Sequence, residues 1–268
     1  MAIGFRRANG AGKKDKDEEK DRHEPGSMTL IEHLAELRRR LIISFIAVAV
    51  CALVGFFLYN PVLDFLVDPY CDVKRSYEGA TTSCRLVVTD PLDSVSIRLK
   101  LSAYIGLLLA SPIVLWQLWR FITPGLYANE KRYAIPFVAS SVLLFMAGAA
   151  VAILTIPQTL RFFAAFGGSD LELLYTPSKY LSLLTLMMLA FGLGFEFPVL
   201  LCFLQLAGVL HWRTLVSWRR YAVVLILIVD AVITPSGDPV TLLALAIPSF
   251  LFYEASILIG RFLIDRNR

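Results

Sequence analysis

The sequence predicts an all-α polytopic membrane protein, with six transmembrane helices in a cupped, concave bundle and both termini in the cytoplasm. Of its 268 residues, 57% are hydrophobic and 18% are charged, whereas a soluble domain carries about 25% charged residues. The apolar residues fall into long runs, most of them close to the roughly 20 residues that a spanning helix needs. The net charge of +4 comes from basic residues at helix ends and on the N-terminal tail, so it does not indicate nucleic-acid binding.

Three regions are predicted: a disordered, charged cytoplasmic tail (1–27), a six-helix membrane domain (28–262) and a short cytoplasmic tail (263–268). The segment Lys13–Glu24 is almost wholly charged and has no apolar periodicity, so it cannot bury a core. No short apolar region with a small-residue cleavage site follows it, so it is not a secretory signal.

Six apolar segments are the candidate spans. They are Leu41–Tyr59, Leu99–Trp119, Tyr133–Ile156, Leu181–Leu206, Tyr221–Ile233 and Val240–Ile259. The fifth is predicted to cover only about 20 Å at about 1.5 Å per residue, and Pro248 interrupts the sixth. The last two are therefore expected to be short helices joined by the tight turn Thr234–Pro239.

Basic residues predict the orientation. Most of the 26 Lys and Arg residues lie in the N-terminal segment, in 120–132, in 213–220 and at the C-terminus. The positive-inside rule places these segments in the cytoplasm.

Glu196 is the most informative residue, because it is the only charge between Leu181 and Leu210. A carboxylate at mid-membrane costs about 2.5–3.5 kcal/mol on insertion scales and usually marks a functional site. A structural carboxyl, hydrogen-bonded to a neighbouring helix, is the alternative. Prolines such as Pro198 kink helices and favour a bundle with Glu196 on its concave face.

Two further carboxylates are predicted at the cytosolic face. Glu36 lies on an amphipathic helix that precedes the first span, and an i,i+4 pair with Arg40 is its simplest explanation. Glu130 lies among the aromatic residues of the loop after Trp119. Together the two acids could bind a cationic peptide, and arginine would suit them because its planar fork matches carboxylates.

The cysteines and the missing motifs complete the sequence prediction. Cys71 and Cys84 share the first outer loop, where the environment is oxidising and a disulfide can form. Cys51 and Cys202 are expected to be packing residues. The sequence has no HExxH, GxSxG or P-loop motif and no metal-binding pattern, so neither an enzyme nor a cofactor is predicted.

Several motifs, in order, resemble the TatC family, the multispanning receptor of the twin-arginine protein translocase. The resemblance covers roughly residues 28–262. It rests on 33–40 (HLAELRRR), 111–113 (SPI), 117–127 (QLWRFITPGLY), 130–132 (EKR), 191–198 (FGLGFEFP), 234–239 (TPSGDP) and 245–248 (LAIP).

The resemblance implies a receptor in the bacterial cytoplasmic membrane that binds twin-arginine signal peptides of folded precursors. By that carry-over Glu36 and Glu130 receive the arginines, Arg38 and Phe121 shape the surface, and Glu196 faces the concave interior. A second pair, Pro69 and Asp238, matches positions used in translocation. The implied partners are the single-span proteins TatA and TatB, membrane lipids and further copies in a larger complex, with energy from the proton-motive force. The charged tail, the cysteine pair and Asp230 depart from the family pattern.

A proton-coupled small-solute transporter is the competing hypothesis, with Glu196 as protonation site and Asp230 or Glu254 as helpers. Midplane acids and broken helices suit a transporter, but transporters usually contain an internal repeat, and none is visible here.

Overall fold

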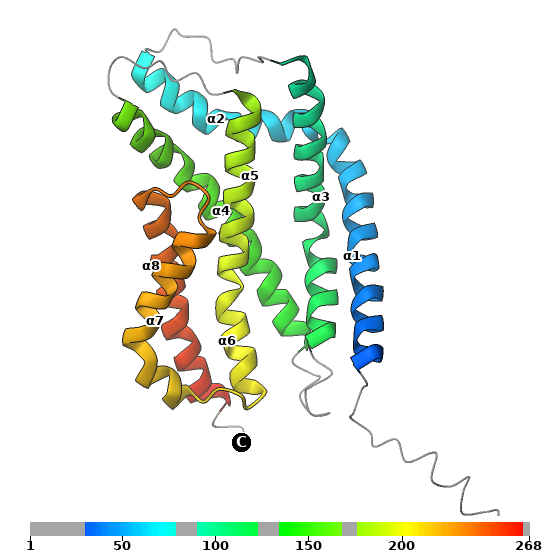
Figure 1. Ribbon diagram of the computed structural model, residues 1–268, viewed down its shortest axis with the longest axis vertical. Helices are drawn as coiled ribbons and strands as arrows, with labels where there is room; N and C mark the ends of the chain where they lie inside the picture. The colour runs from blue at the N-terminus through cyan, green and yellow to red at the C-terminus, as the bar shows by residue number, and fades with distance from the viewer. Residues whose placement is uncertain (1–29, 79–89, 123–133, 168–175, 265–268) are drawn as a thin grey trace, which may run out of the picture. The chain divides into compact units, whose positions relative to one another are not determined.

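The computed structural model describes residues 30–78, 90–122, 134–167 and 176–264. These residues form helices joined by short turns, and no strand occurs in them (Figure 1). In chain order the elements are α1 (Leu30–Phe57), α2 (Tyr59–Glu78), α3 (Pro91–Ile122), α4 (Ala134–Gly167), α5 (Pro177–Phe195), α6 (Phe197–Leu206), α7 (Trp212–Ile233), α8 (Pro239–Ile259) and the π-helical turn η3 (Gly260–Ile264). The chain divides into two units, Met1–Arg39 and Arg40–Arg268, and the packing below belongs to the second.

Five stretches of the described chain are long and apolar enough to cross a membrane: 31–57, 91–122, 135–166, 177–206 and 239–262. The all-helical, multi-pass architecture predicted from the sequence is therefore confirmed. The sixth span, the cupped shape and the side on which the termini lie stay predictions.

The seventh helix extends further than its apolar segment. Helix α7 has 22 residues, enough for about 33 Å at about 1.5 Å per residue. The stretch 213–220, which was predicted to lie in the cytoplasm outside the fifth apolar segment, forms the first turns of this helix. With α8 at 21 residues, the last two helices are shorter than α3 and α4, which have 32 and 34.

Helix α2 was not predicted, because the segment after the first span was interpreted as a loop. Its buried residues Leu66, Tyr70 and Val73 follow helical spacing, so the periodicity was present in the sequence. The helix is anchored to α5, where the Tyr180 hydroxyl donates to the Leu66 carbonyl at 2.6 Å.

Helices α4 and α5 pack most extensively, and α4 also contacts α2, α3 and α8 as it crosses the bundle obliquely (Figure 1). Two glycines allow this close approach. A Cβ at Gly192 would lie 2.7 Å from the ring of Phe145, and a Cβ at Gly148 would collide with the Phe191 carbonyl.

The buried side chains form three clusters. One joins α2, α3, α4 and α5 with Leu245 of α8, and another joins α6, α7 and α8. Between them, the cluster called here the aromatic cluster brings the end of α3 and the start of α4 against α6. Its buried members are Leu115, Trp119, Val138, Phe145, Val199 and Phe203.

Candidate intramembrane carboxylate site

Glu196 lies at a break that divides the fourth predicted span into α5 and α6. It ends one helix and begins the next, with φ −74° and ψ −18°. Its N–H donates to the Leu193 carbonyl at 3.1 Å, a tightened turn three residues back. Pro198 follows two positions later and has no N–H to continue the ladder, which explains the interruption at this point.

The hydrogen-bonding capacity of the Glu196 carboxylate is only partly satisfied by the residues around it. Its Oε1 is buried and makes no hydrogen bond within the described residues, and the Ser141 hydroxyl of α4 faces the carboxylate. Ser141 in turn accepts a hydrogen bond from Trp119 Nε1 at 2.8 Å, and both residues are buried. A buried polar atom without a partner costs free energy, so folding alone does not explain why an acid occupies this position.

The aromatic cluster fixes Trp119 beside this carboxylate. The ring centroids of Trp119 and Phe137 are 5.4 Å apart, and those of Trp119 and Phe203 are 5.2 Å apart. Phe137 and Phe203 meet edge to face at 6.4 Å. Such pairs are worth about 0.5–1.5 kcal/mol beyond their buried area, so the indole donor is held rigidly by three helices.

Neither Trp119 nor Ser141 was singled out from the sequence. Trp119 belonged to a set of aromatic residues that fit the membrane interface on composition alone. Ser141 is separated from Trp119 by 22 residues and from Glu196 by 55. The sequence does show a serine within an apolar helix and an acid within another. That Ser141 contacts Trp119 and Glu196 depends on how the helices pack, which no local pattern shows.

The predicted peptide-binding residues are distributed over different parts of the chain. Glu36 and Arg38 lie in the first turns of α1, in the unit that ends at Arg39. Phe121 lies in the last turn of α3 and is half-buried. Glu130 lies outside the described residues, so the joint site of Glu36 and Glu130 stays a prediction.

The two residues matched to translocation have clear local positions. Pro69 lies inside α2. Asp238 is the N-cap of α8, where its side chain accepts from Thr241 N–H at 2.9 Å and from the Thr241 hydroxyl at 2.7 Å. At 2% exposure this carboxylate has a complete structural role in addition to any role in transport.

The two acids that the transporter hypothesis uses as helpers belong to the α7–α8 pair. Asp230 is buried and faces Ser249 of α8, although its Oδ2 makes no hydrogen bond in the described chain. Glu254 accepts from Arg219 at 2.6 Å, and the Tyr253 hydroxyl donates to the Leu215 carbonyl at 2.6 Å. Glu254 is therefore held in an ion pair that links α7 to α8.

The cysteines separate as the sequence suggested. Cys51 and Cys202 are free, whereas Cys71 on α2 is disulfide-bonded. Cys84 lies outside the described residues, so its pairing with Cys71 stays a prediction.

Comparison with known proteins identifies the family. Residues 32–248 match the family model for the Sec-independent protein translocase protein TatC. The Sec-independent protein translocase protein TatC of Frankia casuarinae is 42% identical over 91% of this chain and 68% of its own length. The Aquifex aeolicus protein of the same name is 39% identical over 87% of this chain and 95% of its own length.

A solved structure supports the same assignment. The crystal structure of the twin-arginine translocase receptor TatC in DDM has a TM-score of 0.69 and 37% identity, covering 85% of this chain and 99% of that one. The motifs, the helical architecture and these matches agree on a protein-transport component rather than a catalytic enzyme or a small-solute transporter. The chain therefore belongs to the TatC family, the multispanning component of the twin-arginine, Sec-independent protein translocase.

Proposed function

We propose that this chain binds the twin-arginine signal peptide of folded precursor proteins at the cytosolic face of the bacterial inner membrane. Glu36 and Glu130 receive the two arginines, and Arg38 and Phe121 shape the surface around them. The single observation that carries this proposal is Glu196, a half-buried intramembrane acid at a helix break, whose buried Oε1 makes no hydrogen bond within the described residues. The apolar part of the bound signal peptide inserts deeper into the membrane, toward Glu196.

An apolar recess supports a place for the hydrophobic part of the signal. It lies between α3, α4 and α5 and is lined by Tyr104, Leu107, Leu108, Phe145, Thr185, Met188 and Leu189. Leu189 is seven residues before Glu196, or about 10 Å along a helix at about 1.5 Å per residue. In the proposed complex, the apolar continuation of the signal peptide occupies this recess.

The proposal extends to partners and energy. Single-span TatA-type and TatB-type proteins assemble with this chain, further copies join a larger complex, and the proton-motive force drives export. Both termini and the segment after α3 lie in the cytoplasm. Support comes from the family assignment and from the distribution of Lys and Arg, which follows the positive-inside rule.

The test is crosslinking of the full-length chain, in lipid, to a twin-arginine peptide and to the same peptide with two lysines. Glu36→Ala and Glu130→Ala are each expected to lower arginine-peptide capture about tenfold, because a charge-assisted hydrogen bond contributes about 1.5–3 kcal/mol. Glu32→Ala, one turn earlier on α1, is the matched control and should leave capture unchanged. Equal capture of both peptides, with no effect of either substitution, would contradict the proposal.

A further inference from the structure

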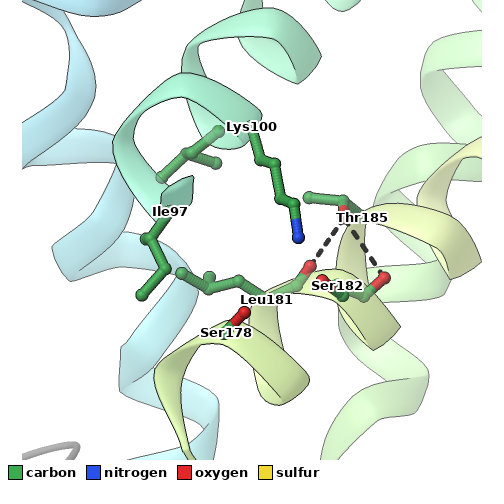
Figure 2. A pocket seen from close by; sticks show the side chains of 7 residues that line it. Ile97, Lys100, Ser178, Leu181, Ser182 and Thr185 are labelled. Atoms are coloured by element: carbon green, nitrogen blue, oxygen red, sulfur yellow. Dashed lines mark hydrogen bonds between the residues drawn. The ribbon is translucent and has the colours of Figure 1, made fainter. Parts of the chain in front are cut away.

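A recess between α3 and α5 is lined by one basic side chain, Lys100, which has no role in the family assignment or in the proposed function. It is lined by Ile97, Lys100, Leu101, Ser178, Leu181, Ser182 and Thr185. Figure 2 shows the Lys100 side chain reaching from α3 toward the turn of α5 that holds Leu181, Ser182 and Thr185. The floor is apolar, because Ile97, Leu101 and Leu181 are buried, whereas Lys100 itself is exposed.

Lys100 has no partner among the described residues that would explain its position. None of the acids there forms an ion pair with it. Its neighbour Arg98 differs, since that guanidinium lies 4.4 Å from the ring centroid of Phe56 and 5.1 Å from that of Tyr59. The Lys100 ammonium therefore has three donor hydrogens available in the recess.

Two hydroxyl groups are available beside the ammonium. Thr185 is already occupied, because it donates to the Leu181 carbonyl at 2.6 Å and to the Ser182 carbonyl at 3.2 Å (Figure 2). Ser178 and Ser182 are half-buried, one turn apart on α5, and their hydroxyls make no hydrogen bond within the described residues. One ammonium and two hydroxyls around a small recess are a donor set for a phosphate group.

The depth of the recess agrees with the level of lipid phosphates. Helix α3 has 32 residues, or about 48 Å, and therefore exceeds a hydrocarbon core of about 30 Å by about 9 Å at each end if it is centred. Lys100 is nine residues beyond Pro91, which places its Cα about 5 Å inside the apolar boundary. The flexible stem of a lysine can carry its charge from there to the headgroup level.

We propose that Lys100, Ser178 and Ser182 bind the phosphate of an anionic phospholipid in the leaflet where α3 and α5 begin. The ammonium and the two hydroxyls contact the phosphate oxygens, and the acyl chains lie along the apolar residues of α3 and α5. In the orientation proposed above, this is the outer leaflet. The lipid bridges two helices that contact each other.

The experiment is a lipid titration of the purified full-length chain, delipidated in non-ionic detergent and followed by native mass spectrometry. Phosphatidylglycerol is the anionic probe and phosphatidylcholine the zwitterionic one. We expect retention of one phosphatidylglycerol, weakened about fivefold by Lys100→Gln, since one basic residue near a membrane surface contributes about that factor. Lys100→Arg should retain the lipid, and Ser178→Ala with Ser182→Ala should weaken it further.

Lys179→Gln is the matched control, because Lys179 is exposed on the same turn of α5 but does not line the recess. A larger loss of phosphatidylglycerol with Lys100→Gln than with Lys179→Gln supports the site. An equal loss with both variants indicates an effect of general surface charge and overturns the proposal. Equal retention of both lipids also overturns it. Glycerol 3-phosphate and inorganic phosphate are the competitors. If either displaces phosphatidylglycerol with an affinity equal to that of the lipid, the recess is a site for a soluble anion and the lipid proposal is overturned. Thermal unfolding without lipid should be the same for every variant.

Discussion

The half-buried acid Glu196 and the buried acid Asp238 both precede the first residue of a helix, but their carboxylates have different partners. Each begins a helix, α6 for Glu196 and α8 for Asp238. Asp238 accepts two hydrogen bonds from Thr241, while the Oε1 of Glu196 has none within the described residues. A carboxylate that caps a helix is explained by stability, whereas one left with an unsatisfied oxygen is better explained by what the protein does.

The largest effect is expected from Glu196→Gln, which keeps the shape of the side chain and removes its ability to ionise. Export of a twin-arginine precursor should fall about tenfold or more, the loss expected from one hydrogen bond to a charged group. The free energy of unfolding should stay within about 1 kcal/mol or rise, because an unsatisfied buried oxygen is a cost. Transport assays and denaturation of the purified protein measure the two quantities separately. A strongly destabilised variant would make Glu196 structural, like Asp238.

Asp238→Ala should show the opposite pattern. Loss of the N-cap is expected to lower the free energy of unfolding by about 1–2 kcal/mol. Asp238→Asn keeps a capping oxygen for the Thr241 N–H and is the matched control, so it should recover most of that stability. Export should follow stability in both variants if capping is the whole role of Asp238. Loss of export by a stable Asp238→Asn variant would show a separate contribution to translocation.

Ser141→Ala tests the surroundings of Glu196, because Ser141 is the residue whose hydroxyl faces that carboxylate. It removes the acceptor of the Trp119 indole and the hydroxyl that faces Glu196, at about 0.6 kcal/mol, the average for hydrogen bonds within membranes. Trp119→Phe removes the same hydrogen bond from the other end. If the bond is what the two residues share, the double variant should cost less than the sum of the single ones in chemical denaturation. Strict additivity would indicate that the two residues act independently.

The smallest effect is expected from the α7–α8 ion pair. Arg219 and Glu254 are 50% and 29% exposed, and exposed pairs contribute about 0.2–1 kcal/mol. A double-mutant cycle with Arg219→Gln and Glu254→Gln should give a coupling at the lower end of that range and little change in export. A large loss of export in the single Glu254 variant would instead restore that residue as a functional acid.

Sequence reasoning reached the helices whose evidence is local. Apolar segments placed five spans, and Pro198 beside Glu196 indicated an irregularity that the structure resolves into two helices. Helix α2 was missed because the segment between the first two spans was interpreted as an outer loop, although Leu66, Tyr70 and Val73 follow a helical period.

The site could be predicted only in part, for a physical reason. Glu196 was evident because a charge in an apolar segment is expensive wherever the chain folds. The contacts of Trp119 with Ser141, and of Arg219 with Glu254, join residues 22 and 35 positions apart, and no local pattern encodes them. The capping role of Asp238 was accessible, since an aspartate directly before Pro239 and an apolar segment is a helix-start signal.

The break at Glu196 gives the fourth membrane crossing two attachments, one on each side of the acid. Helix α5 belongs to the cluster it shares with α2, α3, α4 and Leu245 of α8, while the ten residues of α6 contribute Val199 and Phe203 to the aromatic cluster and Leu201 to the cluster of α7 and α8. Gln205 strengthens the second attachment by donating to the Ser256 carbonyl of α8 at 3.0 Å. Helix α8 therefore contacts both halves of the broken crossing, because Phe252 packs against Phe195 of α5 with ring centroids 5.0 Å apart and Ser256 accepts from Gln205 of α6, so α8 joins the two helices that the acid separates.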